Sequence, residues 1–166
     1  MTLRGIRGVA LLSALAAGLA LALALGSEQW GGLVPCALCL WERWPYRVAI
    51  ACGLLAIVVP YRFSKLLLWL VVSSMLGSVA LAALHVGVEQ RYWASPLPEC
   101  VAPRLSSGSV AARLAQMPAR PTRSCEDPTY LIPAVPVSMA MMNLVYSLMF
   151  AGALGVALRR DHEGVS

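Results

Sequence analysis

Long apolar stretches separated by short charged segments constrain this chain more than any other feature of its sequence. Of its 166 residues, 59% are hydrophobic and 13% are charged, whereas an ordinary soluble domain is about 45–50% apolar and about 25% charged. The apolar residues form four blocks, at about 8–26, 40–60, 66–85 and 137–158. Because a bilayer core about 30 Å thick needs roughly 20 apolar residues per helix, we predict an all-α membrane protein. It is a single domain over 1–166, folded as a four-transmembrane-helix bundle.

The first apolar block has a second interpretation. Arg4 and Arg7 precede an uncharged run rich in Ala and Leu, a pattern that also begins secretory signal peptides. The apolar region of a signal peptide is usually about 7–15 residues long, and the run from Val9 to Leu25 is longer than that. We therefore expect a retained span.

The charges between the blocks predict the orientation of the bundle. Basic residues flank one set of block ends, and these are Arg4, Arg7, Arg62, Lys65, Arg159 and Arg160. Short loops rich in Lys and Arg stay in the cytoplasm, so we expect both termini there and loops of about 27–39 and 86–136 on the opposite side. The pI near 9.2 then reflects membrane orientation, and we expect no nucleic-acid partner.

Four of the five cysteines lie in the two loops on the predicted outer side. Cys36 and Cys39 form a CxxC pair in the short loop, Cys100 and Cys125 lie in the long loop, and Cys52 falls within an apolar block. Disulfides persist outside the cytosol and are suppressed within it. The two pairs therefore predict either redox chemistry or structural disulfides. A bridge across the long loop would stabilise the fold by about 3 kcal/mol in the chain-entropy model.

The surroundings of the CxxC motif narrow its role. Leu40 follows the second cysteine, where attachment of a c-type haem requires histidine. A structural zinc site commonly uses two close cysteine pairs, whereas Cys100 and Cys125 are far apart in sequence. We expect His85 and His162 to be poorly placed for ligation or on the opposite side of the membrane. We therefore predict no metal. A disulfide within CxxC closes too small a loop to add much stability. Redox exchange is the interpretation that we favour.

The sequence after the motif favours a reactive thiolate. The segment 46–59 is too short to cross a bilayer, so we extend the second helix back to Cys39, which then lies in the first helical turn. A helix N-terminus and a nearby cation lower the pKa of a thiol, and Arg43 follows Cys39 by one turn on the same face. Pairing of Arg43 with Glu42 or with lipid headgroups is the alternative. Pro45 predicts a kink or a later helix start.

Electrons from a thiol pair at a membrane surface need an acceptor. The chain has no flavin or nucleotide fingerprint and no haem motif. A lipid-soluble quinone can reach such a site by lateral diffusion. Because the motifs for the other electron acceptors are absent, we favour a quinone as the acceptor.

The stretch "PCALCLWER", with Cys36, Cys39 and Arg43, resembles the signature of the DsbB family of disulfide bond formation proteins. Four spans and a second cysteine pair in the last outer loop agree with this resemblance. It implies a quinone-dependent thiol:disulfide oxidoreductase of the bacterial inner membrane, with its redox cysteines facing the periplasm. A DsbA–DsbB–quinone relay keeps the bacterial periplasm oxidising.

The resemblance also implies a role for each site residue. The disulfide Cys100–Cys125 is attacked by a reduced DsbA-type partner with a thioredoxin fold, and Cys100 forms the mixed disulfide. Cys125 then pairs with Cys36 of the Cys36–Cys39 disulfide. Cys39 is left as a thiolate against ubiquinone or menaquinone, and Arg43 stabilises it.

The sequence also gives expectations for His85 and Asn143, and it leaves two alternative functions open. His85 is expected to be a structural or lipid-interface histidine, with a place near a quinone carbonyl as the alternative, and Asn143 is expected to form a hydrogen bond between helices. One alternative function is a thiol/quinone oxidoreductase similar to vitamin K epoxide reductase, although in that family the CxxC motif follows the other pair. The other is a non-catalytic membrane protein with two structural disulfides.

Overall fold

The computed structural model describes residues 3–100, 109–111, 123–131 and 136–163. Their fold is all-helical, as the sequence predicts, with no strand in these ranges. The elements are α1 (Leu3–Gln29), α2 (Ala37–Val58), α3 (Tyr61–Glu89), the short 3-10 helix η1 (Pro98–Cys100) and α5 (Met139–Glu163).

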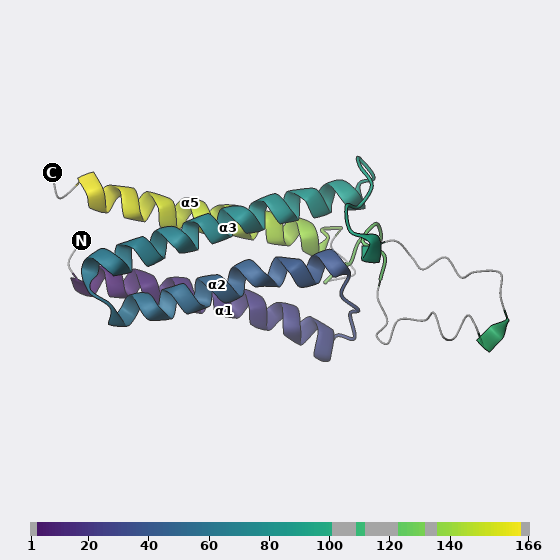
Figure 1. Ribbon diagram of the computed structural model, residues 1–166, viewed down its shortest axis with the longest axis horizontal. Coiled ribbons are helices and arrows are strands. Elements are labelled where there is room, and N and C mark those ends of the chain that lie inside the picture. Colours follow the sequence, from purple (N-terminus) through teal and green to yellow (C-terminus); the bar gives the residue numbers. More distant parts are fainter. Residues whose placement is uncertain (1–2, 101–108, 112–122, 132–135, 164–166) are drawn as a thin grey trace.

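The four long helices lie side by side, with both ends of the chain at one end of the bundle and η1 at the other (Figure 1). Helix α2 packs against both α1 and α3, and α5 packs along α3. Small side chains allow close approach, since Ala10, Ala17, Ala49 and Ala56 are all fully buried. This packing places the N-terminus of α2 and the C-terminus of α3 at the same end as η1, which is where the cysteines lie.

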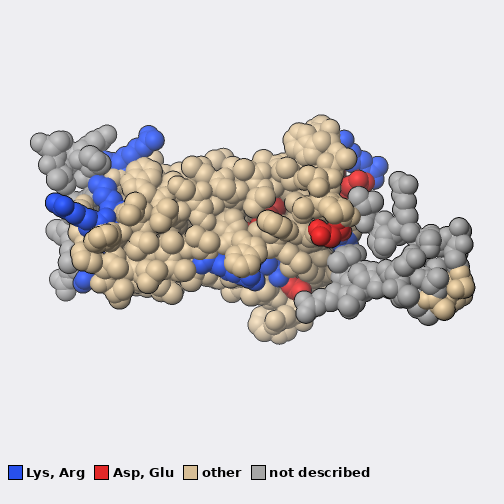
Figure 2. Space-filling view, viewed as in Figure 1, with Lys and Arg blue, Asp and Glu red and all other residues tan. Residues whose placement is uncertain are grey.

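Three of the helices, α1, α3 and α5, are long and apolar enough to cross a membrane. Their outer faces carry exposed leucines, of which Leu12 is 67% exposed and Leu19 is 62% exposed. The space-filling view shows a mostly uncharged surface, interrupted by one basic patch, between a basic end where the chain termini lie and an end with both acidic and basic side chains (Figure 2). These features fit a multi-pass membrane protein. A fourth span at α2, and cytoplasmic termini, stay predictions.

Helix α2 begins at Ala37 and continues through Pro45 to Val58. Cys36 is its N-cap residue, and Cys39 lies in the first turn. Pro45 is buried inside the helix, and its carbonyl oxygen accepts a hydrogen bond of 2.9 Å from the Ser74 hydroxyl of α3. The alternative that the helix begins after Pro45 is therefore wrong.

The close contact of α1 and α2 depends on Gly53. A Cβ atom at this position would lie 3.0 Å from the Ala14 Cβ atom and 3.2 Å from the Ala10 carbonyl oxygen. We expect Gly53→Val to lower the free energy of unfolding by about 1–3 kcal/mol, because overpacking forces the helix backbones apart. Thermal unfolding of the detergent-solubilised protein measures the loss.

Gly77 of α3 provides the matched control, since a Cβ atom there would meet nothing within 4 Å. We expect Gly77→Val to leave the unfolding temperature close to that of the unmodified protein. Equal losses for the two substitutions would contradict a role of Gly53 in helix packing.

Candidate thiol–disulfide site

The structure gathers both cysteine pairs into one buried cluster at the end of the bundle. Cys36, Cys100 and Cys125 are each 3% exposed or less, and Cys39 packs against them. A disulfide joins Cys100 to Cys125. Next to it, the backbone of Arg123 pairs with that of Cys36 in an isolated parallel bridge. This cysteine cluster therefore brings the long-loop disulfide against the N-terminus of α2.

The CxxC cysteines are present as free thiols. Their Sγ atoms lie 2.7 Å apart, and the Cys39 backbone N–H also donates to the Cys36 Sγ atom at 3.2 Å. Contact with the Cys39 thiol and the hydrogen bond from the Cys39 backbone N–H lower the pKa of Cys36 below that of an ordinary thiol, although burial opposes the shift. The sequence analysis placed the thiolate on Cys39, and that assignment stays a prediction.

His85 of α3 lies directly on this thiol pair. Its Nε2 atom is 3.4 Å from the Cys36 Sγ atom, and its Nδ1 atom is 2.8 Å from the Glu42 Oε1 atom. An ionised carboxylate can only accept, so Nδ1 carries the proton in the neutral ring and Nε2 presents its lone pair to Cys36. The structure thus places His85 against a sulfur atom, a contact that the sequence analysis did not expect, and a place near a quinone carbonyl stays an untested alternative.

Two buried carboxylates face this histidine and are held by α5. The Asn143 Nδ2 atom donates to Glu42 Oε2 at 2.9 Å, and the Tyr46 hydroxyl donates to Asn143 Oδ1 at 2.5 Å. Glu89 Oε1 lies 4.0 Å from His85 Nε2, and the hydroxyl of Ser138, the residue before α5, donates to Glu89 Oε2 at 2.5 Å. The interhelical hydrogen bonding expected of Asn143 is present.

Sequence reasoning did not assign a site role to either carboxylate. Glu42 is adjacent to Arg43 and resembles half of a surface ion pair, so its sequence context gives no sign of its burial. Glu89 follows His85 by four residues, a spacing that places both side chains on one helix face. That spacing is the signal that could have identified Glu89.

Arg43 pairs with a residue of the neighbouring helix α1. Its Nη2 atom lies 2.8 Å from the Glu28 Oε2 atom, and its side chain is only 11% exposed. The alternative pairing with Glu42 is not what the structure has. Arg43 and Cys39 nevertheless border the same cavity.

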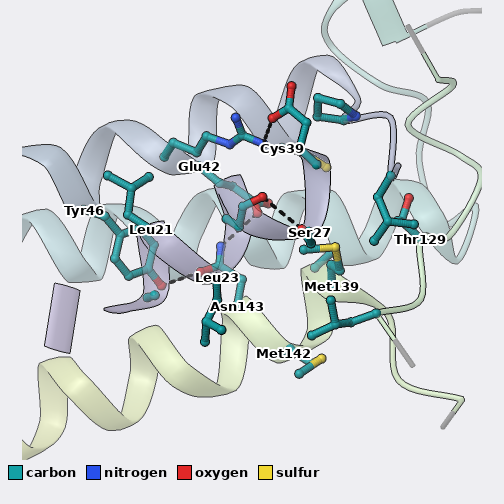
Figure 3. A pocket seen from close by; sticks show the side chains of 18 of the residues that line it. Leu21, Leu23, Ser27, Cys39, Glu42, Tyr46, Thr129, Met139, Met142 and Asn143 are labelled. Atoms are coloured by element: carbon teal, nitrogen blue, oxygen red, sulfur yellow. Dashed lines mark hydrogen bonds and ion pairs between the residues drawn. The ribbon is translucent and has the colours of Figure 1, made fainter. Parts of the chain in front are cut away.

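That cavity lies between α1, α2 and α5 and has a volume of about 280 Å³. Apolar side chains, leucines and methionines among them, form most of its wall, and Glu42, Tyr46 and Asn143 form a polar side (Figure 3). Cys39 also borders it, whereas His85 is not among its lining residues. The thiol pair therefore connects two environments, with Cys36 against the histidine and Cys39 at the cavity.

A helical bundle with membrane-spanning helices, a buried thiol pair and an adjacent loop disulfide defines a membrane protein of thiol–disulfide chemistry. The chain belongs to the family of the disulfide bond formation protein DsbB, whose model matches residues 6–157. This confirms the resemblance seen at the CxxC motif, and the family indicates a disulfide oxidoreductase.

One relative comes from Rickettsia prowazekii (strain Madrid E) and is named "Uncharacterized protein RP370". It is 30% identical over 142 residues, which cover 84% of this chain and 80% of the relative. No solved structure matches the chain.

The hydrogen bonds of Asn143 generate a stability prediction. Asn143→Leu leaves Glu42 Oε2 and the Tyr46 hydroxyl without these partners, so we expect a loss of about 1–3 kcal/mol in the free energy of unfolding. Tyr46→Phe removes one neutral hydrogen bond and should cost about 1 kcal/mol. Chemical denaturation in detergent measures both losses.

A double-mutant cycle separates this network from independent packing effects. Because Tyr46 bonds to Asn143, we expect the combined variant to lose less than the sum of the two single losses. Strictly additive losses would show that the two side chains do not act together.

Proposed function

We propose that this protein is a quinone-dependent disulfide oxidase that reoxidises a periplasmic DsbA-type partner of thioredoxin fold. The observation that carries the proposal is the cysteine cluster, in which a loop disulfide and a thiol pair are buried together beside a largely apolar cavity. Family membership supports the thiol–disulfide chemistry. The partner, the quinone and the inner-membrane location are inferred from that family and from the chemistry of the site.

The cavity fits a quinone head group in size and composition. Ligand pockets are mostly apolar with a few polar groups and usually have volumes of about 300–1,000 Å³, so a cavity of about 280 Å³ accommodates a ring but not a long isoprenoid tail. Leu21, Met142 and Tyr46 would contact the ring, while Arg43 and Asn143 provide donors for its oxygens. A bound quinone accepts two electrons and two protons and becomes a quinol.

Four thiol–disulfide exchange steps bring two electrons from the partner to the CxxC pair. A partner thiolate attacks Cys100, the Cys100–Cys125 bond breaks, and the partner's second thiolate then attacks the mixed disulfide, forms the partner's own disulfide and releases Cys100. Cys125 then attacks Cys36 of the oxidised CxxC pair and releases Cys39 as a thiolate. Finally Cys100 attacks Cys125, restores the loop disulfide and releases Cys36. Each exchange forms one sulfur–sulfur bond and breaks one, so two electrons pass to the pair.

Oxidation of the CxxC pair returns the site to its starting state. A bond forms between Cys36 and Cys39, and two electrons and two protons leave. His85 Nε2 is 3.4 Å from Cys36 Sγ and accepts the Cys36 proton, while Glu42 on Nδ1 stabilises the imidazolium. Cys39, which borders the cavity, is the sulfur through which electrons leave.

A disulfide within the CxxC motif would close too small a loop to add much stability, which speaks against a non-catalytic protein with two structural disulfides. The position of the CxxC motif speaks against a vitamin K epoxide reductase-like arrangement, because here it precedes the loop pair along the chain.

The activity can be tested with purified protein, ubiquinone or menaquinone, and a reduced DsbA-type partner. We expect partner oxidation with one quinol formed per disulfide. Cys100→Ser should reduce partner oxidation to background while quinone still oxidises the Cys36–Cys39 pair, as followed by thiol trapping. Cys52→Ser is the matched control, because Cys52 packs against the bundle core, and it should retain full turnover. Absence of turnover with every quinone would overturn the proposal.

Arg43 should contribute to quinone binding because its guanidinium borders the cavity and is held by Glu28. Loss of one hydrogen bond to a charged group costs about 1.5–3 kcal/mol, so we expect Arg43→Met to raise the KM for quinone at least about tenfold. Initial rates at saturating partner measure this change.

Arg47→Met is the control for Arg43→Met, since Arg47 lies on the same helix over the Trp44 ring, 5.1 Å from its centroid, and does not line the cavity. We expect it to leave the quinone KM unchanged. An unchanged KM in both variants would remove Arg43 from the quinone site.

A further inference from the structure

The cysteine cluster also contains an unassigned set of metal-ligating atoms. The Sγ atoms of Cys36 and Cys39 and a ring nitrogen of His85 lie within 4.8 Å of one another. The sequence analysis expected no metal because it placed His85 away from the CxxC motif, and the structure corrects that placement. We propose that the reduced CxxC pair and His85 bind one soft divalent cation of the Zn²⁺ type, which holds the pair in its reduced form.

The positions of the three ligand atoms need only a small adjustment for such an ion. Zn–S bonds of about 2.3 Å and Zn–N bonds of about 2.0–2.1 Å separate tetrahedral ligands by roughly 3.5–3.8 Å. The Cys36 Sγ to His85 Nε2 distance is already 3.4 Å. The two sulfurs lie 2.7 Å apart and must separate by about 1 Å. Cys39 borders the cavity, so its side chain has room to rotate.

The second ring nitrogen of His85 has the partner that metal-bound histidines have. Such a histidine almost always donates its other N–H to a carboxylate, a carbonyl or water, which fixes the tautomer and the ring orientation. Here Nδ1 lies 2.8 Å from Glu42 Oε1, and Glu42 is itself held by Asn143. Nε2 is therefore oriented toward the thiols with its lone pair available.

The charges around the thiol pair also favour a cation. The side chains of Glu42 and Glu89 are 9% and 4% exposed, and both face His85. A protonated His85 would balance only one of these carboxylates, and the nearby cation Arg43 is paired with Glu28. Glu89 Oε2 accepts from Ser138, and Glu89 Oε1 lies 4.0 Å from His85 Nε2. Glu89 lies outside the three-ligand group, so its carboxylate contributes negative charge near the ion.

The oxidation state of the CxxC pair determines whether the ion binds. Two thiols exchange two protons for one divalent cation, and no electrons are transferred. A Cys36–Cys39 disulfide offers no thiolate, so it cannot form this site. Occupancy thus competes with formation of the disulfide. An ion bound to both thiolates would therefore act as an inhibitor of CxxC oxidation.

Co²⁺ provides a spectroscopic probe of this site in the full-length protein. The Cys100→Ser/Cys125→Ser background removes the other thiols of the cluster. After reduction and removal of the reductant, we expect one equivalent of Co²⁺ to produce a thiolate-to-cobalt charge-transfer band and tetrahedral d–d bands. One equivalent of Zn²⁺ should abolish them, and protein oxidised at Cys36 and Cys39 should show neither band.

Variants in the same background identify the ligands. Cys39→Ser should weaken the charge-transfer band, and His85→Gln should abolish the tetrahedral d–d bands. Glu42→Gln should lower the Co²⁺ affinity by about 10–100-fold. Cys52→Ser is the matched control and should change nothing. The proposal is overturned if the reduced protein gives no charge-transfer band, or if a folded His85→Gln variant gives the same spectrum. Neither partner nor quinone is present, so the result is independent of the proposed oxidase activity.

Discussion

The hydrogen bond between the Glu42 carboxylate and the His85 imidazole, at 2.8 Å, is the interaction on which the arrangement of the site depends. A carboxylate buried in an apolar bundle costs several kcal/mol unless charged or polar groups satisfy it. Its partners come from two other helices, His85 from α3 and Asn143 from α5. The one favourable arrangement of these three side chains therefore also fixes how α2, α3 and α5 meet beside Cys36.

This arrangement gives the two cysteines of one motif different surroundings. Cys36 caps α2, accepts a hydrogen bond from the Cys39 backbone N–H and faces His85. Cys39 lies one helical turn further along and borders the cavity. The proposed proton acceptance and the proposed metal ligation both use the His85 Nε2 lone pair, because Glu42 holds the proton on Nδ1. On these proposals, proton transfer and ion binding exclude each other.

Apolar blocks and the CxxC spacing are local features, so the sequence predicts the helical class and the motif. The contact between His85 and Cys36 joins positions 49 residues apart and depends on how α2 packs against α3, which no local pattern reports. Which of the two CxxC sulfurs carries the thiolate depends on the hydrogen bonds that each accepts, and spacing does not determine that. Glu28, the partner of Arg43, lies on α1 beyond the reach of helix-periodicity arguments.

The charges of α2 explain why it is absent from the helices that qualify as spans by composition. Glu42 is paired with His85 and Asn143, Arg43 with Glu28, and Arg47 lies over the Trp44 ring. A polar residue within a membrane is tolerated where it faces the bundle interior and has partners. Two of the three charged residues that remove the apolar signature of α2, Glu42 and Arg43, are thus residues of the site. A fourth span at α2 is compatible with its charge because neighbouring helices, rather than lipid, surround Glu42 and Arg43.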